Sequence, residues 1–231
     1  KSNLAGISGF KNILDGVVKK IGKENPSVED WNNYTPQGAQ ETRIKETILN
    51  VLKEMDFKTF YDTQIAEGYK YYYNQVNYNY NIDYNPRDIV GDNPNDSKER
   101  FYGNNDTKGP DALHGSHVAG IIGADRTNKI GIMGVADNVL IMGVRNTPNG
   151  DERDKDVANA IRYAADNGAK VLNMSFGKSY SWDKAVVDEA VKYAVSKDVL
   201  LVHAAGNDNK DIDVENNFPN ATYLDGKVAS S

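Results

Sequence analysis

Apolar residues in the first third of the chain recur at the three- and four-residue spacing of amphipathic helices. The spacing predicts helices over residues 1–24, from Thr35-Pro36 to about 55, and over 65–76. The stripes consist of Ile7, Phe10, Ile13, Leu14, Val17, Val18 and Ile21, then Ile44, Ile48, Val51, Leu52 and Met55, then Ile65, Tyr69, Tyr72, Tyr73 and Val76. Several glycines make such helices marginal in isolation. We therefore expect residues 1–85 to form a helical layer packed on the rest of the chain, rather than a separately folding domain.

The hydrophobic period changes in the second half of the chain. Short continuous apolar runs at 139–144, 171–174 and 199–202 alternate with helical stripes at 157–164 and 186–195. Strands that are apolar on both faces and alternate with helices indicate a parallel sheet covered by helices, an α/β fold. Right-handed crossovers place the three strands side by side. Functional residues then gather beyond the carboxyl ends of the strands.

Eight of the chain's 14 tyrosines crowd residues 61–84. An aromatic surface for sugars, peptides or bases is one interpretation. The other is packing of an amphipathic helical face against the neighbouring domain, with the hydroxyls reaching water. We favour packing, because the spacing is that of a buried helical face.

Residues 85–110 are dense in turn-forming Asn, Asp, Gly and Pro, as in 92–97 and 103–106. Oxygen side chains at this density leave a calcium site open as an alternative to ordinary turns. The spacing does not match an EF-hand loop, and we expect no required cofactor.

Composition narrows the function classes. The 231 residues carry a formal net charge of -6, which argues against nucleic acid as a partner. The sequence contains no apolar run of the roughly 20 residues needed to span a membrane and no visible signal peptide at Lys1. Without cysteine, disulfides and thiol catalysis are excluded.

Residues 114–120, His-Gly-Ser-His-Val-Ala-Gly, hold two of the three histidines of the chain. If this stretch is helical, His114 and His117 leave the same side of the helix. The small residues around them would let the helix lie close to a sheet and aim His114 as a general base. A zinc site is the alternative, but the glutamate of His-Glu-x-x-His and a third ligand are missing.

Three motifs then occur in the order of one protease family. Residues 114–120 closely resemble the catalytic-histidine segment of the subtilisin-like serine proteases (subtilases), with Ser116 in place of the usual Thr. Residues 173–177, Asn-Met-Ser-Phe-Gly, resemble the family's substrate-binding strand. Residues 204–207, Ala-Ala-Gly-Asn, resemble its oxyanion-hole segment.

The resemblance implies a role for each matched residue. His114 is the base, His117 is not a triad member, and Asn207 donates to the developing oxyanion. The other matched residues would bind substrate: Ser175, Phe176 and Gly177 through their backbone, and Ala204, Ala205 and Gly206 as the wall of a side-chain pocket. His203 has no role in the family and is expected to be a core histidine.

Two parts of a serine protease have no counterpart in the sequence. The orienting aspartate should end an upstream strand, and Asp15, the nearest candidate, lies within a helical period. The nucleophile should lie downstream in Gly-Thr-Ser-Met-Ala, and Ser175, Ser230 and Ser231 lack that context. We therefore expect a chain truncated at both ends. Residues 228–230 would begin the next core strand.

These points combine into one expectation. Residues 86–231 form part of a subtilisin-like three-layer core, and residues 1–85 are an insertion of the kind found in large subtilases of Bacteroidetes-type bacteria, which share the Tyr-Gly-Asn-Asn-Asp of 102–106. The resemblance implies a serine endopeptidase acting on peptides or proteins, secreted or at the surface or in the periplasm of a bacterium. The alternatives are a peptide-binding module without catalysis and an interaction domain built on the tyrosine-rich helices.

Overall fold

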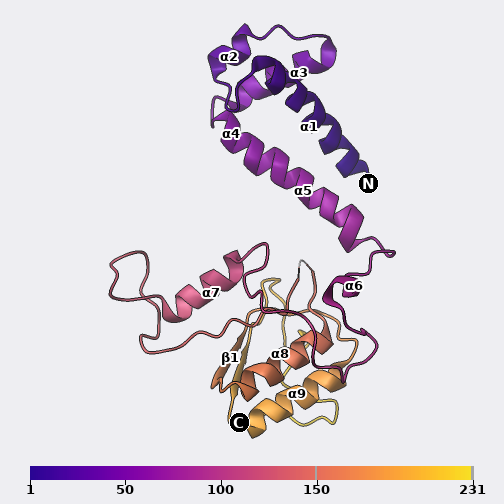
Figure 1. Ribbon diagram of the computed structural model, residues 1–231, viewed down its shortest axis with the longest axis vertical. Coiled ribbons are helices and arrows are strands. Elements are labelled where there is room, and N and C mark those ends of the chain that lie inside the picture. The colour runs from indigo at the N-terminus through magenta and orange to yellow at the C-terminus, as the bar shows by residue number, and fades with distance from the viewer. Residues whose placement is uncertain (149, 230–231) are drawn as a thin grey trace. The chain divides into compact units, whose positions relative to one another are not determined.

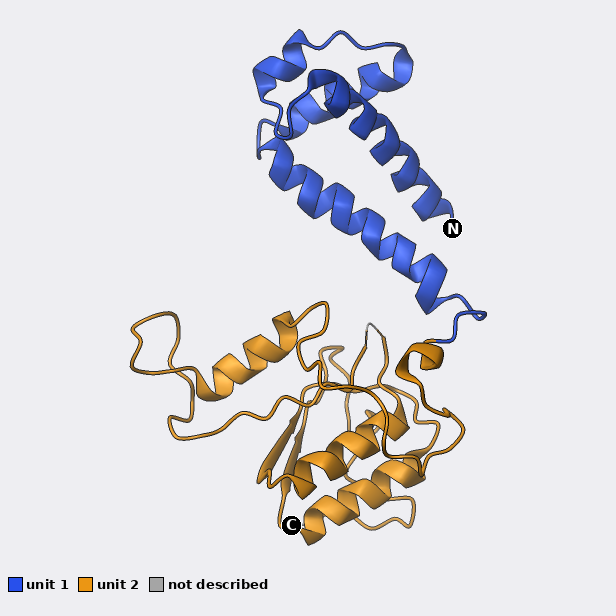
Figure 2. Cartoon of the chain, in the orientation of Figure 1, with its two compact units in different colours: residues 1–85 blue, residues 86–231 orange. Residues whose placement is uncertain are grey.

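The computed structural model describes residues 1–148 and 150–229. The chain forms two compact units, Lys1–Asn85 and Pro86–Ser231 (Figure 2). None of the described helices combines the length and apolarity that crossing a bilayer requires. The packing of residues 1–85 on the core stays a prediction.

The first unit is helical, as the hydrophobic period predicts (Figure 1). Its elements are α1 Ser2–Ile21, α2 Val28–Asn33, α3 Ala39–Val51, α4 Phe57–Phe60, the π-helix η1 Tyr61–Ala66, α5 Glu67–Asn74 and the π-helix η2 Gln75–Asn79. Helix α3 begins later than predicted from Thr35-Pro36, because Gly38 has a φ of 87°, outside the helical region. Helix α2 was not predicted, and a reciprocal capping box between Ser27 and Asp30 starts it.

The first unit has its own apolar core. Trp31 is fully buried at its centre, with the Phe57 ring centroid 5.8 Å from its own. The buried side chains come from five successive elements: Leu14, Val17, Trp31, Ile44, Ile48, Phe57 and Ile65.

The tyrosines of residues 69–84, in α5, in η2 and just after η2, lie outside this core. Helix α5 buries none of its residues, and Tyr71 and Tyr80 are 59% and 78% exposed. Ring pairs instead link Tyr69 to Tyr73, Tyr73 to Tyr78 and Tyr78 to Tyr84, with centroids 4.9–6.1 Å apart. Within this unit these tyrosines therefore pack largely against one another, and their packing against the second unit stays a prediction.

The second unit contains a parallel sheet and four helices among its described residues. Its elements are α6 Arg87–Val90, α7 Leu113–Gly123, α8 Asp154–Asp166, β1 Val171–Met174, α9 Lys184–Ser196 and β2 Leu200–His203. Strands β1 and β2 pair in parallel, with Val171 opposite Leu200 and Met174 opposite His203. The α/β class is confirmed, and Asn167-Gly168 ends α8 as predicted, with Gly168 at a φ of 87°.

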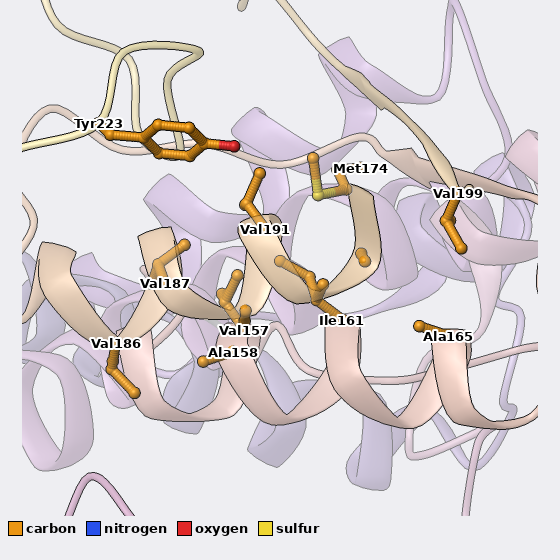
Figure 3. Close-up of a cluster of buried hydrophobic side chains, with 12 residues drawn as sticks. Val157, Ala158, Ile161, Ala165, Met174, Val186, Val187, Val191, Val199 and Tyr223 are labelled. Carbon is orange, nitrogen blue, oxygen red and sulfur yellow. The ribbon is translucent and has the colours of Figure 1, made fainter. Parts of the chain in front are cut away.

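Helices α8 and α9 cover one face of this sheet. Figure 3 shows Val157, Ala158 and Ile161 of α8 facing the valines of α9, with Met174 of β1 beside them. Alanines at the helix contact, among them Ala158, Ala190 and Ala194, let the two backbones approach closely. Val171, Leu200 and Val202 point to the other face and stay exposed. Of the three layers expected, the described structure thus contains two: the sheet and the helical layer on one of its faces.

The predicted strand over 139–144 is wrong. The described sheet has two strands, and Leu140 is fully exposed. A strand needs a neighbouring strand to pair its backbone N–H and C=O groups. Among the described residues, no backbone hydrogen bond joins 139–144 to β1. The run predicted at 228–230 forms a single antiparallel bridge, between Thr222 and Val228. Ser230 and Ser231 lie outside the described residues.

Candidate active site

The two motifs that follow the strands meet at one pocket of about 280 Å³. Because β1 and β2 are parallel, their carboxyl ends lie at the same edge of the sheet, and the loops leaving them run side by side. All the residues expected to bind substrate line this pocket, together with Asn207: Ser175, Phe176, Gly177, Ala204, Ala205 and Gly206. The structure therefore brings together residues about 30 positions apart, as the topology requires.

Local backbone geometry explains the two glycines of the pocket. Gly206 has a φ of 94°, which L-residues with a side chain rarely adopt. At Gly177, a Cβ would lie 2.4 Å from Oδ1 of Asn217, so only glycine fits without displacement. The turn after β2 and the close approach after β1 thus both depend on the missing side chain.

Asn207 is the candidate oxyanion donor at this pocket. The residue is exposed at the pocket wall, and within the described part of the chain its side chain has no hydrogen-bond partner. Because its amide N–H groups have no other acceptor among the described residues, one of them can donate to negative charge that develops on a bound carbonyl oxygen.

Asn217 is a pocket residue that the sequence did not reveal. Its Nδ2 donates to the Ala204 carbonyl at 2.8 Å, while its Oδ1 lies against Gly177. The Asn217 amide therefore contacts both the loop after β1 and the loop after β2, and helps to set the distance between them. Asn217 stands among other turn-forming asparagines, and no periodicity marks it out.

Lys178, in the loop that follows β1, anchors this loop to neighbouring segments, and the sequence did not reveal it either. Its backbone exchanges two hydrogen bonds with Phe218, at 2.8 and 3.3 Å. Its side chain is 9% exposed, and its ammonium lies 2.8 Å from Oδ1 of Asp154 and donates to the Glu152 carbonyl at 2.6 Å. Burial by itself raises the pKa of Asp154, but hydrogen bonds from Lys178, the Asp183 N–H and Ser181 outweigh it and hold that pKa below its ordinary value.

Helix α7 confirms that 114–120 is helical, but not that it lies close to the sheet along its length. None of its residues is buried, and His114 and His117 are exposed and do not line the pocket. Its close contact is at the far end, where a Cβ on Gly123 would lie 2.9 Å from Val139. The absence of a side chain at Gly123 therefore lets α7 pack closely against the run 139–144, which lies outside the sheet.

The remaining candidates for charge and metal chemistry have other partners. Asp15 lies in α1, where it pairs with Lys11 at 2.6 Å and accepts from the Tyr61 hydroxyl. In the loop segment, Asn93, Asp96, Asn104 and Asp106 bond backbone N–H groups two residues on, which is ordinary turn chemistry. Among the described residues, no group of three His, Asp or Glu could hold a metal ion.

The sequence also matches known proteins. A sequence profile of the subtilase family matches residues 44–225. A thermophilic serine proteinase of Bacillus sp. (strain AK1) is 45% identical over 95 residues, or 41% of this chain and 23% of that protein. Thermitase of Thermoactinomyces vulgaris is 43% identical over 95 residues, or 41% of this chain and 33% of that protein. The cell wall-associated protease of Bacillus subtilis (strain 168) is 37% identical over 130 residues, 56% of this chain and 14% of that protein.

The matched stretches thus span a third or less of these curated relatives. No solved structure matches the chain significantly.

Proposed function

The chain belongs to the subtilase family, and from this membership we propose that it is the central part of a subtilisin-like serine endopeptidase. The main support for this proposal is the pocket at the strand ends, which is lined by Ser175, Phe176 and Gly177 and by Ala204, Ala205 and Gly206. An extended peptide would pair with the first loop through main-chain groups and insert one side chain against the small-residue wall.

In the proposed reaction, a serine attacks the peptide carbonyl while His114 takes its proton, and Asn207 donates to the oxyanion. The nucleophile and the orienting aspartate belong to segments outside residues 1–231. The family's peptide or protein substrates and the pocket chemistry support this assignment. We propose that the reaction requires no cofactor, with a calcium site in the turn-rich segment 85–110 as the alternative.

A fluorophosphonate probe on the full-length protein tests the assignment. The expected result is covalent labelling of a serine downstream of residue 231, abolished by His114→Ala, which removes the base that activates the nucleophile. Residues 1–231 alone should neither be labelled nor hydrolyse a chromogenic peptide. Peptide binding by an unlabelled full-length protein would decide for the non-catalytic binding module instead.

Asn207→Ala in the full-length protein tests the oxyanion role. We expect kcat to fall by about 10²- to 10³-fold with KM nearly unchanged, which is the magnitude for removal of one oxyanion donor from a subtilisin. An unchanged kcat with an intact fold would remove Asn207 from this role.

We further propose that the full-length protein is secreted or held at the cell surface. The names of the relatives include both an external and an internal location: a cell wall-associated protease and a major intracellular serine protease, both from Bacillus subtilis. Fractionation of the producing cells, with detection of the protein in each fraction, decides between them.

A further inference from the structure

His203 occupies the end of β2 beside the loop that leaves β1. The parallel register sets it opposite Met174, and the chain continues from Met174 into Ser175, Phe176 and Gly177. The imidazole is half-buried at this edge and does not line the pocket. His203 therefore lies behind the loop that lines the pocket.

The imidazole holds Phe176 through two contacts. Its Nε2 lies 2.7 Å from the Phe176 carbonyl oxygen, and its ring stands edge-on to the phenyl ring with centroids 6.2 Å apart. A carbonyl only accepts, so Nε2 must carry the proton in this contact. Burial lowers the pKa of His203, and the hydrogen bond to the carbonyl opposes that effect only in part, so the neutral Nε2–H tautomer is favoured.

Fixing this carbonyl also fixes the next amide. The Phe176 C=O and the Gly177 N–H belong to one trans peptide plane and point in opposite directions. With the carbonyl drawn toward β2, the Gly177 N–H is turned away from His203. Gly177 lines the pocket, and Asn217 limits its movement from the other side.

We propose that His203 is a positioning residue that orients the Phe176–Gly177 peptide so that the loop can pair with the backbone of an extended substrate. The inference rests on the proposed peptide-binding role of this pocket. It assigns a function to a histidine that lies outside the three matched motifs and that the sequence placed in the core. Catalysis remains with groups that touch the reacting atoms.

Two substrates separate this role from a merely structural one. A tetrapeptide anilide pairs with the loop, whereas a single-residue ester with the same side chain at the cleaved bond does not extend along it. In the full-length protein, His203→Leu keeps similar bulk and removes the donor. We expect it to raise KM for the tetrapeptide about tenfold and to leave kcat/KM for the ester within about twofold.

His203→Gln is the matched control, because its amide Nε2 can donate from a similar position. It should keep the tetrapeptide KM within about threefold of the original. Equal losses on both substrates, or an unchanged tetrapeptide KM in the leucine variant, would overturn the proposal. If the leucine variant does not fold, His203→Asn, whose donor is too short to reach the carbonyl, replaces it with the same expectation.

A binding measurement keeps this inference separate from the proposed function. If the unaltered protein hydrolyses neither substrate, the endopeptidase assignment fails. Fluorescence anisotropy with a labelled tetrapeptide then tests His203 directly, with about tenfold weaker binding expected for His203→Leu and near-normal binding for His203→Gln. No binding by the unaltered protein, or equal binding by all three, contradicts the positioning role.

Discussion

The guanidinium of Arg87 lies 2.6 Å from the carboxylate of Asp92, and both side chains are buried. Lys155 also reaches Asp92, at 2.7 Å, and Arg87 extends to Asp156 at 2.7 Å. The Tyr102 hydroxyl donates to the same Asp156. This network ties the segment after Pro86 to the first turn of α8, and α8 in turn carries the Asp154 that anchors Lys178.

Asp92→Asn should therefore destabilise the second unit by about 3 kcal/mol, because it leaves two buried cations short of a counter-charge. The midpoint of urea unfolding, followed by circular dichroism, measures the loss. Asp137→Asn is the matched control, since its exposed pair with Arg126 spans 3.7 Å and should contribute little. Equal midpoints for the two variants would contradict a stabilising role of the network.

The same carboxylate predicts how stability depends on acid. Burial raises the pKa of Asp92, but hydrogen bonds from Arg87 and Lys155 outweigh it and bring the pKa to about 2. A folded-state pKa below the unfolded value of about 3.9 gives stability that is present above pH 4 and is lost as pH falls toward 2.

This contribution should be about 2–3 kcal/mol. Thermal unfolding between pH 6 and pH 2.5 checks it. The difference in Tm between the unaltered chain and Asp92→Asn should shrink as the pH falls, and a constant difference would argue against the shifted pKa.

Two glycines of the first unit should respond differently to alanine. Gly16 is exposed in the middle of α1 with nothing near a Cβ, so Gly16→Ala should stabilise by about 0.5–1 kcal/mol. At Gly68 a Cβ would lie 2.8 Å from Cδ1 of Ile7, so the steric cost should cancel that gain. Denaturant unfolding followed by Trp31 fluorescence compares the two, and an equal gain at both sites would show that Ile7 moves freely aside.

Gly177→Ala should weaken substrate binding in the full-length protein. The new Cβ meets Oδ1 of Asn217, whose other amide atom holds the Ala204 carbonyl, so relief of the clash displaces one of the two loops. We expect kcat/KM on an extended peptide to fall by about tenfold to a hundredfold, mainly through KM. Gly143→Ala, whose Cβ finds only an ordinary contact with Thr107, should leave the kinetics unchanged. An unaffected KM in the Gly177 variant would mean that Asn217 yields without cost.

The sequence pattern alone predicted those helices and strands in which buried residues recur at the regular spacing of the element. Helices α1, α8 and α9 and strands β1 and β2 follow from the spacing of apolar residues, because each element turns one regular face to the core. The grouping of Ser175 with Asn207 also follows, since parallel strands must end at one edge.

Only the tertiary structure decided the contacts between distant segments. The apolar run 139–144 looks like a core strand, yet it has no partner for its backbone within the described sheet. Arg87 meets Asp156 across 69 residues, and Asn217 meets Ala204 and Gly177 from a third loop. Such polar contacts have no period, because a side chain is held by whichever partner the folded backbone places within hydrogen-bond distance.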